Sequence, residues 1–572
     1  MASLVEFSDV IGDRRSVIFC GMGGLAVPNL SDGNMTVGQF PRSGNAGVVG
    51  MLRGLRRGFL GCVLLNLLLL LLSYGALLRV HYSGDTYIVY ALDDSLVNIR
   101  NGRPLGYLFA KGAYFLNLQR ATVQPLMTVL FLVLISACVA VLAAHIALCC
   151  EKEELCSQRA LSLARLFLVD LAVLIVFVNG FFLDWMRFPE CYVMIYGPAL
   201  FFTFAALYLT VSVLSNRHRT GKSHAAKWLA IALCLLLSSW CYQVSLFLYL
   251  QLAIGIALAE STRRFEYAAC TAVRSGIAVV LAGLISSIGA KVIYLTFVSR
   301  GMIDPSLPVR TSVLSLEAIA ENARFILENL RYVLIDGLGS NLPYLLPLAL
   351  CASLFGALYS AISVNRNHLL RAVVSTFAIV AILALVFAVQ LISANHDLSA
   401  RTLLGAFGAI SGLLLVSICG EKPESCKMFL AVDFVILLAV LVAGIIACRI
   451  GSRVELQINE QERWYSGVVE SAIREYEDET GNVVTTIVRA SDAAPSLRRE
   501  PIDAPLFCDR TWSIATYWTT TYMINEYEGT SYVNREMSHE DKERLFGGAN
   551  YDSFDPAAEM AFEGDKLYLL VY

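Results

Sequence analysis

The chain has 572 residues, of which 57% are hydrophobic and only 16% are charged, and its mean hydropathy is +0.62. Soluble proteins carry about 25% charged residues, so this composition excludes a soluble enzyme, a fibrous protein and a disordered chain. The net charge of −3 is the sum of a basic part and an acidic part of the chain. Residues 1–448 hold 32 Lys and Arg against 24 Asp and Glu, whereas residues 449–572 hold 12 against 23. We expect a membrane protein with an acidic, water-exposed tail.

The first 50 residues are rich in glycine and serine and show no periodic pattern, so residues 1–50 are expected to form a flexible cytoplasmic extension. The first apolar run covers residues 58–78 and closely follows Arg53, Arg56 and Arg57. The run is too long for the hydrophobic region of a signal peptide, and no small-residue cleavage site follows it. It is therefore predicted to stay in the membrane as a helix.

Ten further apolar runs follow, most of them near the length of about 20 residues that crosses a hydrocarbon core of about 30 Å. They lie near 122–148, 160–180, 191–214, 228–242, 244–259, 275–298, 343–363, 372–392, 402–420 and 428–448. The stretch 228–259 is broken by the polar patch 240–243, which favours two short helices that meet at a polar apex. The sequence thus predicts an all-α membrane domain over residues 51–448 with about eleven transmembrane helices.

Lysine and arginine gather in alternate loops between these runs, and such loops face the cytoplasm. The basic residues of these loops are Arg53, Arg56, Arg57, Arg217, Arg219, Lys222, Lys227, Arg263, Arg264, Arg366, Arg371, Lys422 and Lys427. This pattern predicts a cytoplasmic N-terminus. Because the number of crossings is odd, residues 449–572 are then expected outside the cytoplasm, as an extracytoplasmic C-terminal domain.

The acidic tail is predicted to be a small α+β domain, with a charged helix over 455–478 and strands at 483–488 and 567–571. In the outer loop 299–342, apolar residues recur near the 3.6-residue period and predict a helix from Ser315 to Leu334. Such a helix can lie on the membrane surface or cover a cavity.

Candidate chemistry gathers in the outer loops. The first of them contains the adjacent carboxylates Asp93 and Asp94, which are costly to keep near lipid unless they have a function, and the second contributes Glu190. The other polar candidates expected at the same membrane surface are Arg100, Arg103, Tyr242, Gln243, Arg324, Arg331, His396 and Arg401. Carboxylates can activate a hydroxyl, and arginines can hold a phosphate through paired hydrogen bonds. This combination suits an enzyme that acts on a lipid-linked phosphate, and a solvated loop or a surface salt bridge is the alternative for each residue.

The sequence lacks the motifs of nucleotide-binding and metal sites and the pattern of an ion-coupled transporter. Neither a Gly-x-x-x-x-Gly-Lys-Ser/Thr phosphate loop nor a His-Glu-x-x-His motif occurs, so the donor of a transferred group is expected to arrive through the membrane or at its outer surface. The cysteines 149, 150 and 156 have no histidine at ligand spacing, and no metal site is predicted. Asp170, Lys291 and Asp433 are scattered rather than gathered at a midplane, which argues against an ion-coupled transporter.

The order of the motifs resembles a known family. Asp93-Asp94 and Gly102-Arg103-Pro104 follow the first helix, Phe188-Pro189-Glu190 precedes a later span, and Tyr242-Gln243 lies in the broken hairpin. This order is similar to that of the membrane glucosyltransferases of the O-antigen-modifying, serotype-converting type. They belong to the GT-C class of polyprenyl-phosphate-sugar-dependent glycosyltransferases. The resemblance covers roughly residues 55–450.

The resemblance implies a GT-C fold and the transfer of a hexose, in this family glucose, from a polyprenyl-phosphate-linked donor to a cell-surface glycan at the outer face. It singles out Asp93 and Asp94 for catalysis, with Glu190 as a third acidic candidate. The cations that would hold the leaving polyprenyl phosphate are Arg103, Arg324, Arg331 and Arg401. No cofactor is specified, a divalent cation is left open, and the partners are the donor, the acceptor and the lipid bilayer rather than nucleic acid. The alternatives are a transporter or flippase for a lipid-linked saccharide, or an oligosaccharide polymerase or ligase.

Overall fold

Long apolar helices make up most of the computed structural model. It describes residues 44–93, 95–151, 159–215, 222–306, 315–335, 342–365, 367–392, 400–420, 427–491, 519–547 and 556–571. Within these residues, ten helical segments are long and apolar enough to cross a membrane, two of them in the helix at 244–299, and a bent pair at 163–186 makes an eleventh if it counts as one span. The chain therefore has the architecture of a multi-pass membrane protein, as predicted. Of the predicted extension 1–50, residues 1–43 lie outside the described residues.

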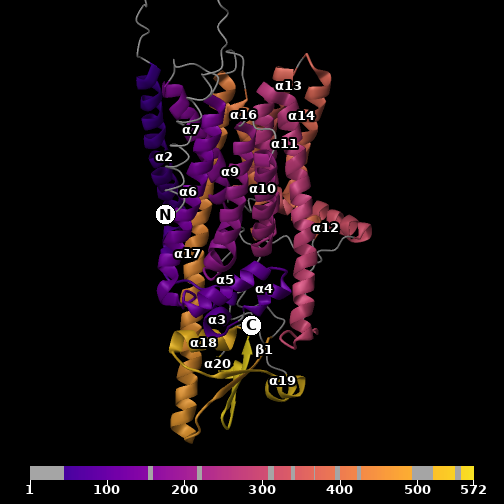
Figure 1. Cartoon of the computed structure of the whole chain (residues 1–572). Coiled ribbons are helices and arrows are strands. Elements are labelled where there is room, and N and C mark those ends of the chain that lie inside the picture. Colours follow the sequence, from indigo (N-terminus) through magenta and orange to yellow (C-terminus); the bar gives the residue numbers. More distant parts are fainter. Residues whose placement is uncertain are drawn as a thin grey trace, which may run out of the picture. The chain divides into compact units, whose positions relative to one another are not determined.

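The apolar helices form one bundle in which segments distant in sequence lie side by side (Figure 1). They are α2 (Gly44–Tyr74), α6 (Gln124–Glu151), α7 (Arg159–Leu174), α9 (Gly197–Ser215), α10 (Lys222–Cys241), α11 (Val244–Ser299), α13 (Leu345–Asn365), α14 (Leu369–Ala384), α16 (Gly405–Cys419) and α17 (Lys427–Thr480). Two carboxyl groups inside the bundle have polar partners, which lipid would not offer. Asn66 Nδ2 donates to Asp170 Oδ1 at 3.0 Å, and Ser417 Oγ donates to Asp433 Oδ2 at 2.6 Å.

The bent span consists of α7 and α8 (Gly180–Met186), which meet at an angle of 62°. Asn179 lies at the bend, where its Oδ1 caps α8 by accepting from the Phe182 amide at 2.9 Å. Its Nδ2 donates to the carbonyl oxygens of Ile175 and Val176, both at 2.9 Å. One side chain thus satisfies the backbone groups that the bend releases inside an apolar environment.

The predicted break in the stretch 228–259 is confirmed. Helix α10 ends at Cys241 and α11 begins at Val244, so that Tyr242 and Gln243 form the apex between them. Helix α11 departs from helical dihedral angles at Arg264 (φ −151°, ψ 70°), where it divides into two membrane spans.

The connection after α2 folds into three short helices, α3 (Gly84–Ala91), α4 (Leu96–Arg100) and α5 (Pro104–Phe115). Ser83 and Thr86 form a capping box that starts α3. Gly102, with φ of +70°, makes the turn between α4 and α5. Farther along the chain, α12 (Leu316–Leu334) begins after its cap Ser315 and confirms the predicted helix; Figure 1 shows it projecting from the side of the bundle.

The tail forms the predicted small α+β unit. Helix α17 runs unbroken across the predicted boundary at residue 448, and a four-stranded sheet of order β2-β1-β4-β3 packs beside its end. The strands are β1 (Thr486–Ser491), β2 (Val533–Glu536), β3 (Met560–Glu563) and β4 (Lys566–Val571), with helices α18 (Thr520–Glu528), α19 (His539–Phe546) and α20 (Pro556–Glu559). Strand β1 is parallel to β2 and β4, whereas β3 and β4 are antiparallel. Figure 1 shows this unit at the same end of the bundle as α3, α4 and α5.

Candidate functional site

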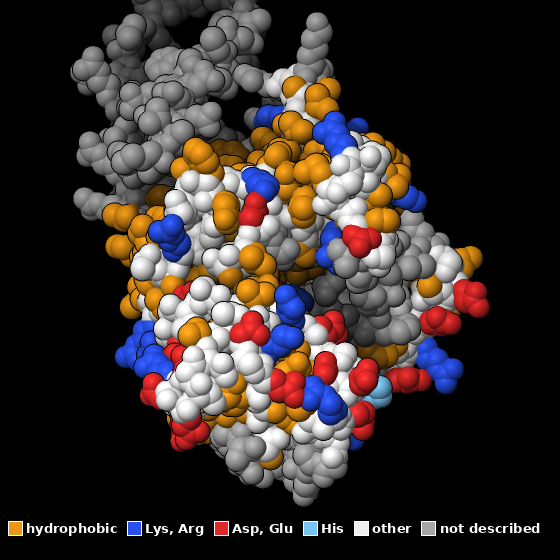
Figure 2. Space-filling view, turned by 90° about the horizontal axis from the view of Figure 1, so that it is seen from below, with side chains coloured by type: hydrophobic (Ala, Val, Ile, Leu, Met, Phe, Trp, Pro, Cys, Tyr) orange, Lys and Arg blue, Asp and Glu red, His pale blue; other side chains and the backbone are white. Residues whose placement is uncertain are grey.

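A cavity of about 140 Å³ opens between the connection α3–α5 and the segment that follows α8. Its lining residues are Asp85, Val89, Leu92, Asp93, Ser95, Val97, Asn98, Asn101, Arg103, Ala110, Tyr114, Gln119, Glu190, Cys191, Met194 and Ile195. Figure 2, which views the molecule from the end with the sheet, shows a hollow in this face with acidic and basic side chains gathered beside it. The cavity thus joins polar groups from two segments that lie about 100 residues apart.

Glu190 is the buried carboxyl of this cavity. It follows Pro189 in the short connection between α8 and a π-helical turn, Tyr192–Tyr196, a type of turn that often occurs at functional sites. Thr86 Oγ1 donates to Glu190 Oε2 at 2.8 Å. Burial, and then the nearby charge of Asp85, raise the pKa of Glu190 to about 8. This group therefore exchanges its proton near neutral pH, as a general base or acid requires.

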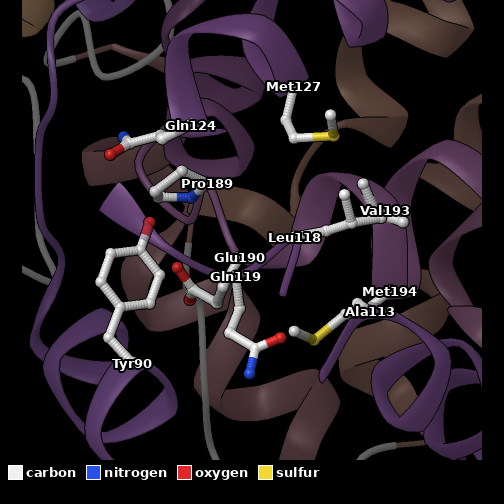
Figure 3. A pocket seen from close by; sticks show the side chains of 10 residues that line it. All are labelled: Tyr90, Ala113, Leu118, Gln119, Gln124, Met127, Pro189, Glu190, Val193 and Met194. Atoms are coloured by element: carbon white, nitrogen blue, oxygen red, sulfur yellow. The ribbon is translucent and has the colours of Figure 1, made fainter. Parts of the chain in front are cut away.

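A second, smaller void lies against Glu190 (Figure 3). Its volume of about 10 Å³ leaves room for about one water molecule. Glu190, Gln119 and Met194 line both spaces, so the carboxyl lies at the wall between them. Figure 3 shows these side chains together with Tyr90, which approaches from α3.

Asp85 shares the cavity with Glu190, and the sequence analysis did not single it out. It is exposed and lies in the first turn of α3, where a negative charge is favoured by the helix dipole. The Ser83–Thr86 capping box places Asp85 there, and that pattern is the one sequence signal for this residue. Its proximity to Glu190 depends on a contact between distant segments.

The predicted pair Asp93-Asp94 is described only in part, because Asp94 lies outside the described residues. Asp93 lines the rim of the cavity and forms an ion pair with Lys111. Burial would raise the pKa of Asp93, but hydrogen bonds from Lys111 and Ser95 outweigh burial and lower it. A carboxylate with a lowered pKa is a weaker base, so Glu190, whose pKa is raised, is the stronger base of the two.

Two predicted arginines lie against aromatic rings, and Arg103 lines the cavity whereas Arg401 is not among its lining residues. The Arg103 guanidinium lies 4.8 Å from the ring centre of Tyr242, and that of Arg401 lies 5.0 Å from the ring centre of Phe188. Burial lowers the pKa of Arg103. A cation that is costly to bury attracts an anionic ligand, and Arg103 lines the cavity that such a ligand would enter.

The predicted apex residue Gln243 holds the turn that presents Arg103. Its Nε2 donates to the carbonyl oxygen of Gly102 at 3.2 Å, next to that of Asn101 at 3.4 Å. The structure therefore brings the connection α3–α5 and the broken hairpin together at one end of the bundle. Arg100 ends α4 just before this turn and does not belong to the lining residues of the cavity.

The remaining predicted cations lie elsewhere. Arg324 is exposed on α12 and pairs with Glu328 at 3.0 Å, one turn farther along the same helix. Arg331 lies on α12 as well, and neither belongs to the lining residues of the cavity. His396 lies outside the described residues.

Three residues that line this cavity carry a buried polar atom without a partner. Asn98 Oδ1, Gln119 Oε1 and Arg103 Nε have no hydrogen-bond partner in the described part of the chain. Buried polar atoms are rarely left so. A ligand with hydroxyl groups and an anionic group would satisfy all three, and sequence reasoning missed Asn98 and Gln119 because isolated amides carry no pattern. Within the same described part, no three His, Cys, Asp or Glu side chains are placed to hold a metal ion.

Comparison of the chain with protein-family models, curated proteins and solved structures finds no match. The predicted GT-C fold and the resemblance to serotype-converting glucosyltransferases thus stay predictions.

Proposed function

We propose that this chain is an integral-membrane glycosyltransferase that moves a hexose, in the first instance glucose, from a polyprenyl-phosphate-linked donor to a cell-surface glycan at the outer face of the membrane. One observation carries the proposal: Glu190, whose pKa is raised to about 8, shares a single cavity with Arg103 and with Asn98 and Gln119, whose amide oxygens have no hydrogen-bond partner in the described part of the chain. A sugar phosphate presents hydroxyl groups to the amides and an anion to the arginine, so its chemistry matches that of the cavity.

The proposed reaction is an inverting displacement with one base. The Glu190 carboxylate accepts the proton of the acceptor hydroxyl, whose oxygen then attacks the anomeric carbon of the hexose. The bond between that carbon and the phosphate oxygen breaks, and polyprenyl phosphate leaves with the electron pair. Arg103, which lines the cavity, would stabilise the charge that develops on the phosphate. Because one displacement completes the transfer, no covalent intermediate on the protein is needed.

The surroundings of the cavity suit a donor that stays anchored in lipid. Helix α5 exposes Leu108 and Phe115 on its surface, next to the cation Lys111. An amphipathic helix of this kind rests at the boundary between head groups and acyl chains. The polyprenyl chain would therefore stay in the bilayer while its phosphate and sugar reach the cavity.

The test is transfer by purified protein in vesicles that contain polyprenyl-phosphate glucose and an acceptor glycan. A new glycosidic bond, detected as the added mass of one hexose on the acceptor, is expected with the wild-type chain and lost in Glu190→Gln. Glu317→Gln on α12 is the matched control, because Glu317 is exposed and does not line the cavity. A donor that changes sides without forming a bond would identify a flippase instead, and addition of a whole oligosaccharide would identify a polymerase or ligase.

A further inference from the structure

We propose that the part of α17 beyond the membrane belongs to the framework of the site, and that Glu455 and Asn459 are positioning residues. They hold the two segments that carry Asp85 and Glu190. The catalytic consequence rests on the proposed function, whereas the positioning itself is a structural property that can be tested without any transfer assay.

Glu455 fixes the segment that carries Glu190. Arg187 Nε donates to Glu455 Oε2 at 2.7 Å, and Arg187 Nη1 donates to Asp184 Oδ1 at 3.3 Å. All three side chains are buried. Removing one partner from a buried ion pair leaves an uncompensated charge, so this contact holds Arg187 strongly. Glu190 follows Arg187 by three residues and depends on its position.

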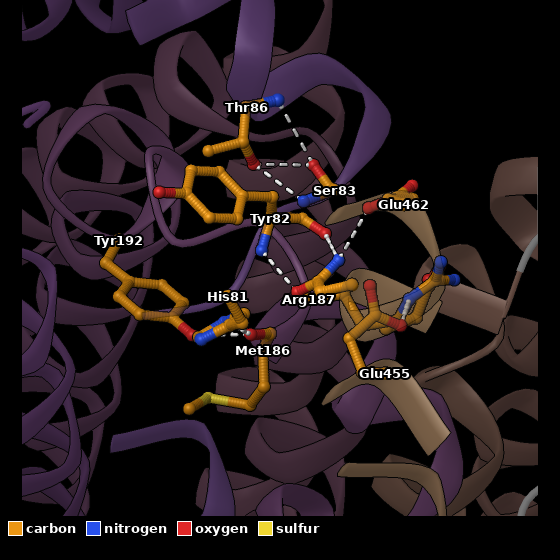
Figure 4. Close-up of polar contacts among 11 residues, drawn as sticks. His81, Tyr82, Ser83, Thr86, Met186, Arg187, Tyr192, Glu455 and Glu462 are labelled. Atoms are coloured by element: carbon orange, nitrogen blue, oxygen red, sulfur yellow. Dashed lines mark hydrogen bonds and ion pairs between the residues drawn. The ribbon is translucent and has the colours of Figure 1, made fainter. Parts of the chain in front are cut away.

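Asn459 fixes the start of α3. Its Oδ1 accepts from the Tyr82 amide, and its Nδ2 donates to the Tyr82 carbonyl, both at 2.9 Å. The side-chain amide of Asn459 therefore holds both the backbone N–H and the backbone carbonyl of Tyr82. Figure 4 shows Tyr82 beside Ser83 and Thr86, the residues of the capping box. Tyr82 directly precedes the cap Ser83, and Asp85 follows in the first turn.

The tail strengthens the same contact. Tyr87 of α3 is 1% exposed and packs in one hydrophobic cluster with Tyr465 of α17 and Ile524 of α18. Its hydroxyl donates to Glu462 Oε2 at 2.7 Å and contacts the Tyr527 hydroxyl at 2.8 Å. Helix α3 thus completes the core of the C-terminal unit as well as a wall of the cavity.

The two segments are also joined to each other, because Thr86 of α3 donates to Glu190. Glu455, Asn459 and Glu462 follow one another at spacings of four and three residues, which place them on one face of α17. Glu460 lies on the same helix and is exposed. Glu455, Asn459 and Glu462 therefore form a polar stripe that contacts the segments of the site. A displacement of α3 or of the connection after α8 would change the surroundings of Glu190.

Hydrogen exchange of the full chain in micelles tests the positioning. In Asn459→Ala, amide exchange over residues 83–91 should accelerate about tenfold or more, since a buried group loses its partners. In Glu455→Gln the same acceleration is expected over 187–192. Exchange in β1 and β4 should stay as in the wild type, and Glu460→Gln should change neither region. If Asn459→Ala does not fold, Tyr527→Phe removes one hydroxyl from the contact and should accelerate exchange over 83–91 by a smaller factor.

Unchanged exchange over 83–91 and 187–192 would overturn the proposal, and so would equal acceleration in the sheet, because the stripe would then only stabilise the tail. Transfer kinetics add a separate readout: kcat should fall about tenfold or more with little change in the KM for the donor, and the pH midpoint of the rate should move down as water reaches Glu190. If the wild-type protein forms no glycosidic bond, the proposed function fails, and the exchange data still decide whether α17 positions these segments.

Discussion

Glu190 is a buried carboxyl group near the charge of Asp85. Since its pKa is raised from 4.5 to about 8, the folded protein binds this proton more tightly than the unfolded chain does. Its contribution to stability is complete below the ordinary pKa and is lost as the pH rises through about 8. We therefore expect the wild-type melting temperature to fall over this range and Glu190→Gln to flatten the dependence. Thermal denaturation in micelles at a series of pH values measures both, and parallel curves would contradict this account.

Asp85 provides a test of the electrostatic coupling inside the cavity. Its negative charge is the second cause, after burial, of the raised pKa of Glu190. Asp85→Asn removes that charge and should shift the pH midpoint of transfer to lower values, because Glu190 then loses its proton more readily. The pH profile of kcat/KM measures the shift. An unchanged midpoint would show that Asp85 does not act on the group that titrates.

Arg103 and Arg324 form a matched pair of cations for testing phosphate binding. Arg103 lines the cavity, whereas Arg324 is exposed on α12 and pairs with Glu328. Arg103→Ala should raise the KM for the donor about 10- to 100-fold, since a hydrogen bond to a charged group contributes about 1.5–3 kcal/mol. Arg324→Ala should leave the KM within about twofold, because exposed ion pairs contribute little. Equal effects of the two substitutions would remove Arg103 from the proposed site.

Helix boundaries follow from local patterns where polar residues interrupt an apolar run. The polar apex at Tyr242 and Gln243 was predicted for this reason, and so was α12 behind its cap Ser315. The bend at Asn179 was not predicted, because it depends on hydrogen bonds to backbone groups that only the folded chain brings within reach.

The candidate site was predictable to the extent that its residues form recognisable motifs. Glu190 and Arg103 were selected from such motifs, and both line the cavity. Asp85 and Asn98 were missed, since their significance arises from contacts between the first loop and the segment after α8. The spacing of residues along the sequence does not predict which distant segments come into contact in the folded bundle.

Close packing of α11 against α16 depends on glycine. A Cβ atom added to Gly255 would lie 2.5 Å from the carbonyl oxygen of Gly412, whereas one added to Gly276 would meet nothing within 4 Å. Small residues allow helices in a membrane to approach this closely. Gly255→Ala should therefore destabilise the protein by about 1–3 kcal/mol, the usual cost of overpacking. Gly276→Ala is the control and should be neutral or slightly stabilising. Denaturation in mixed micelles measures the difference, and equal stabilities would contradict close packing at Gly255.

The orientation of the whole chain in the membrane decides whether the cavity faces the donor that we propose. The basic loops predict that the start of α10 is cytoplasmic and that the C-terminal unit is not. Tyr82, at the end of the first span, contacts Asn459 on α17, so the cavity and the C-terminal unit lie at one end of the bundle. A result that places the C-terminal unit therefore places the cavity as well.

Labelling with a membrane-impermeant thiol reagent tests this orientation. Ser531 and Ser223 are exposed, and each can be replaced by cysteine in a cysteine-free chain. In intact cells, made permeable at the outer membrane where one exists, Ser531→Cys should react and Ser223→Cys should react only after lysis. The break between α10 and α11 supports this result. A single span there would reverse the side of the membrane on which every later connection lies, and the basic loops after residue 259 would then lie outside. Labelling of Ser223→Cys alone in intact cells would place the cavity on the cytoplasmic side, and transfer at the outer face would then be excluded.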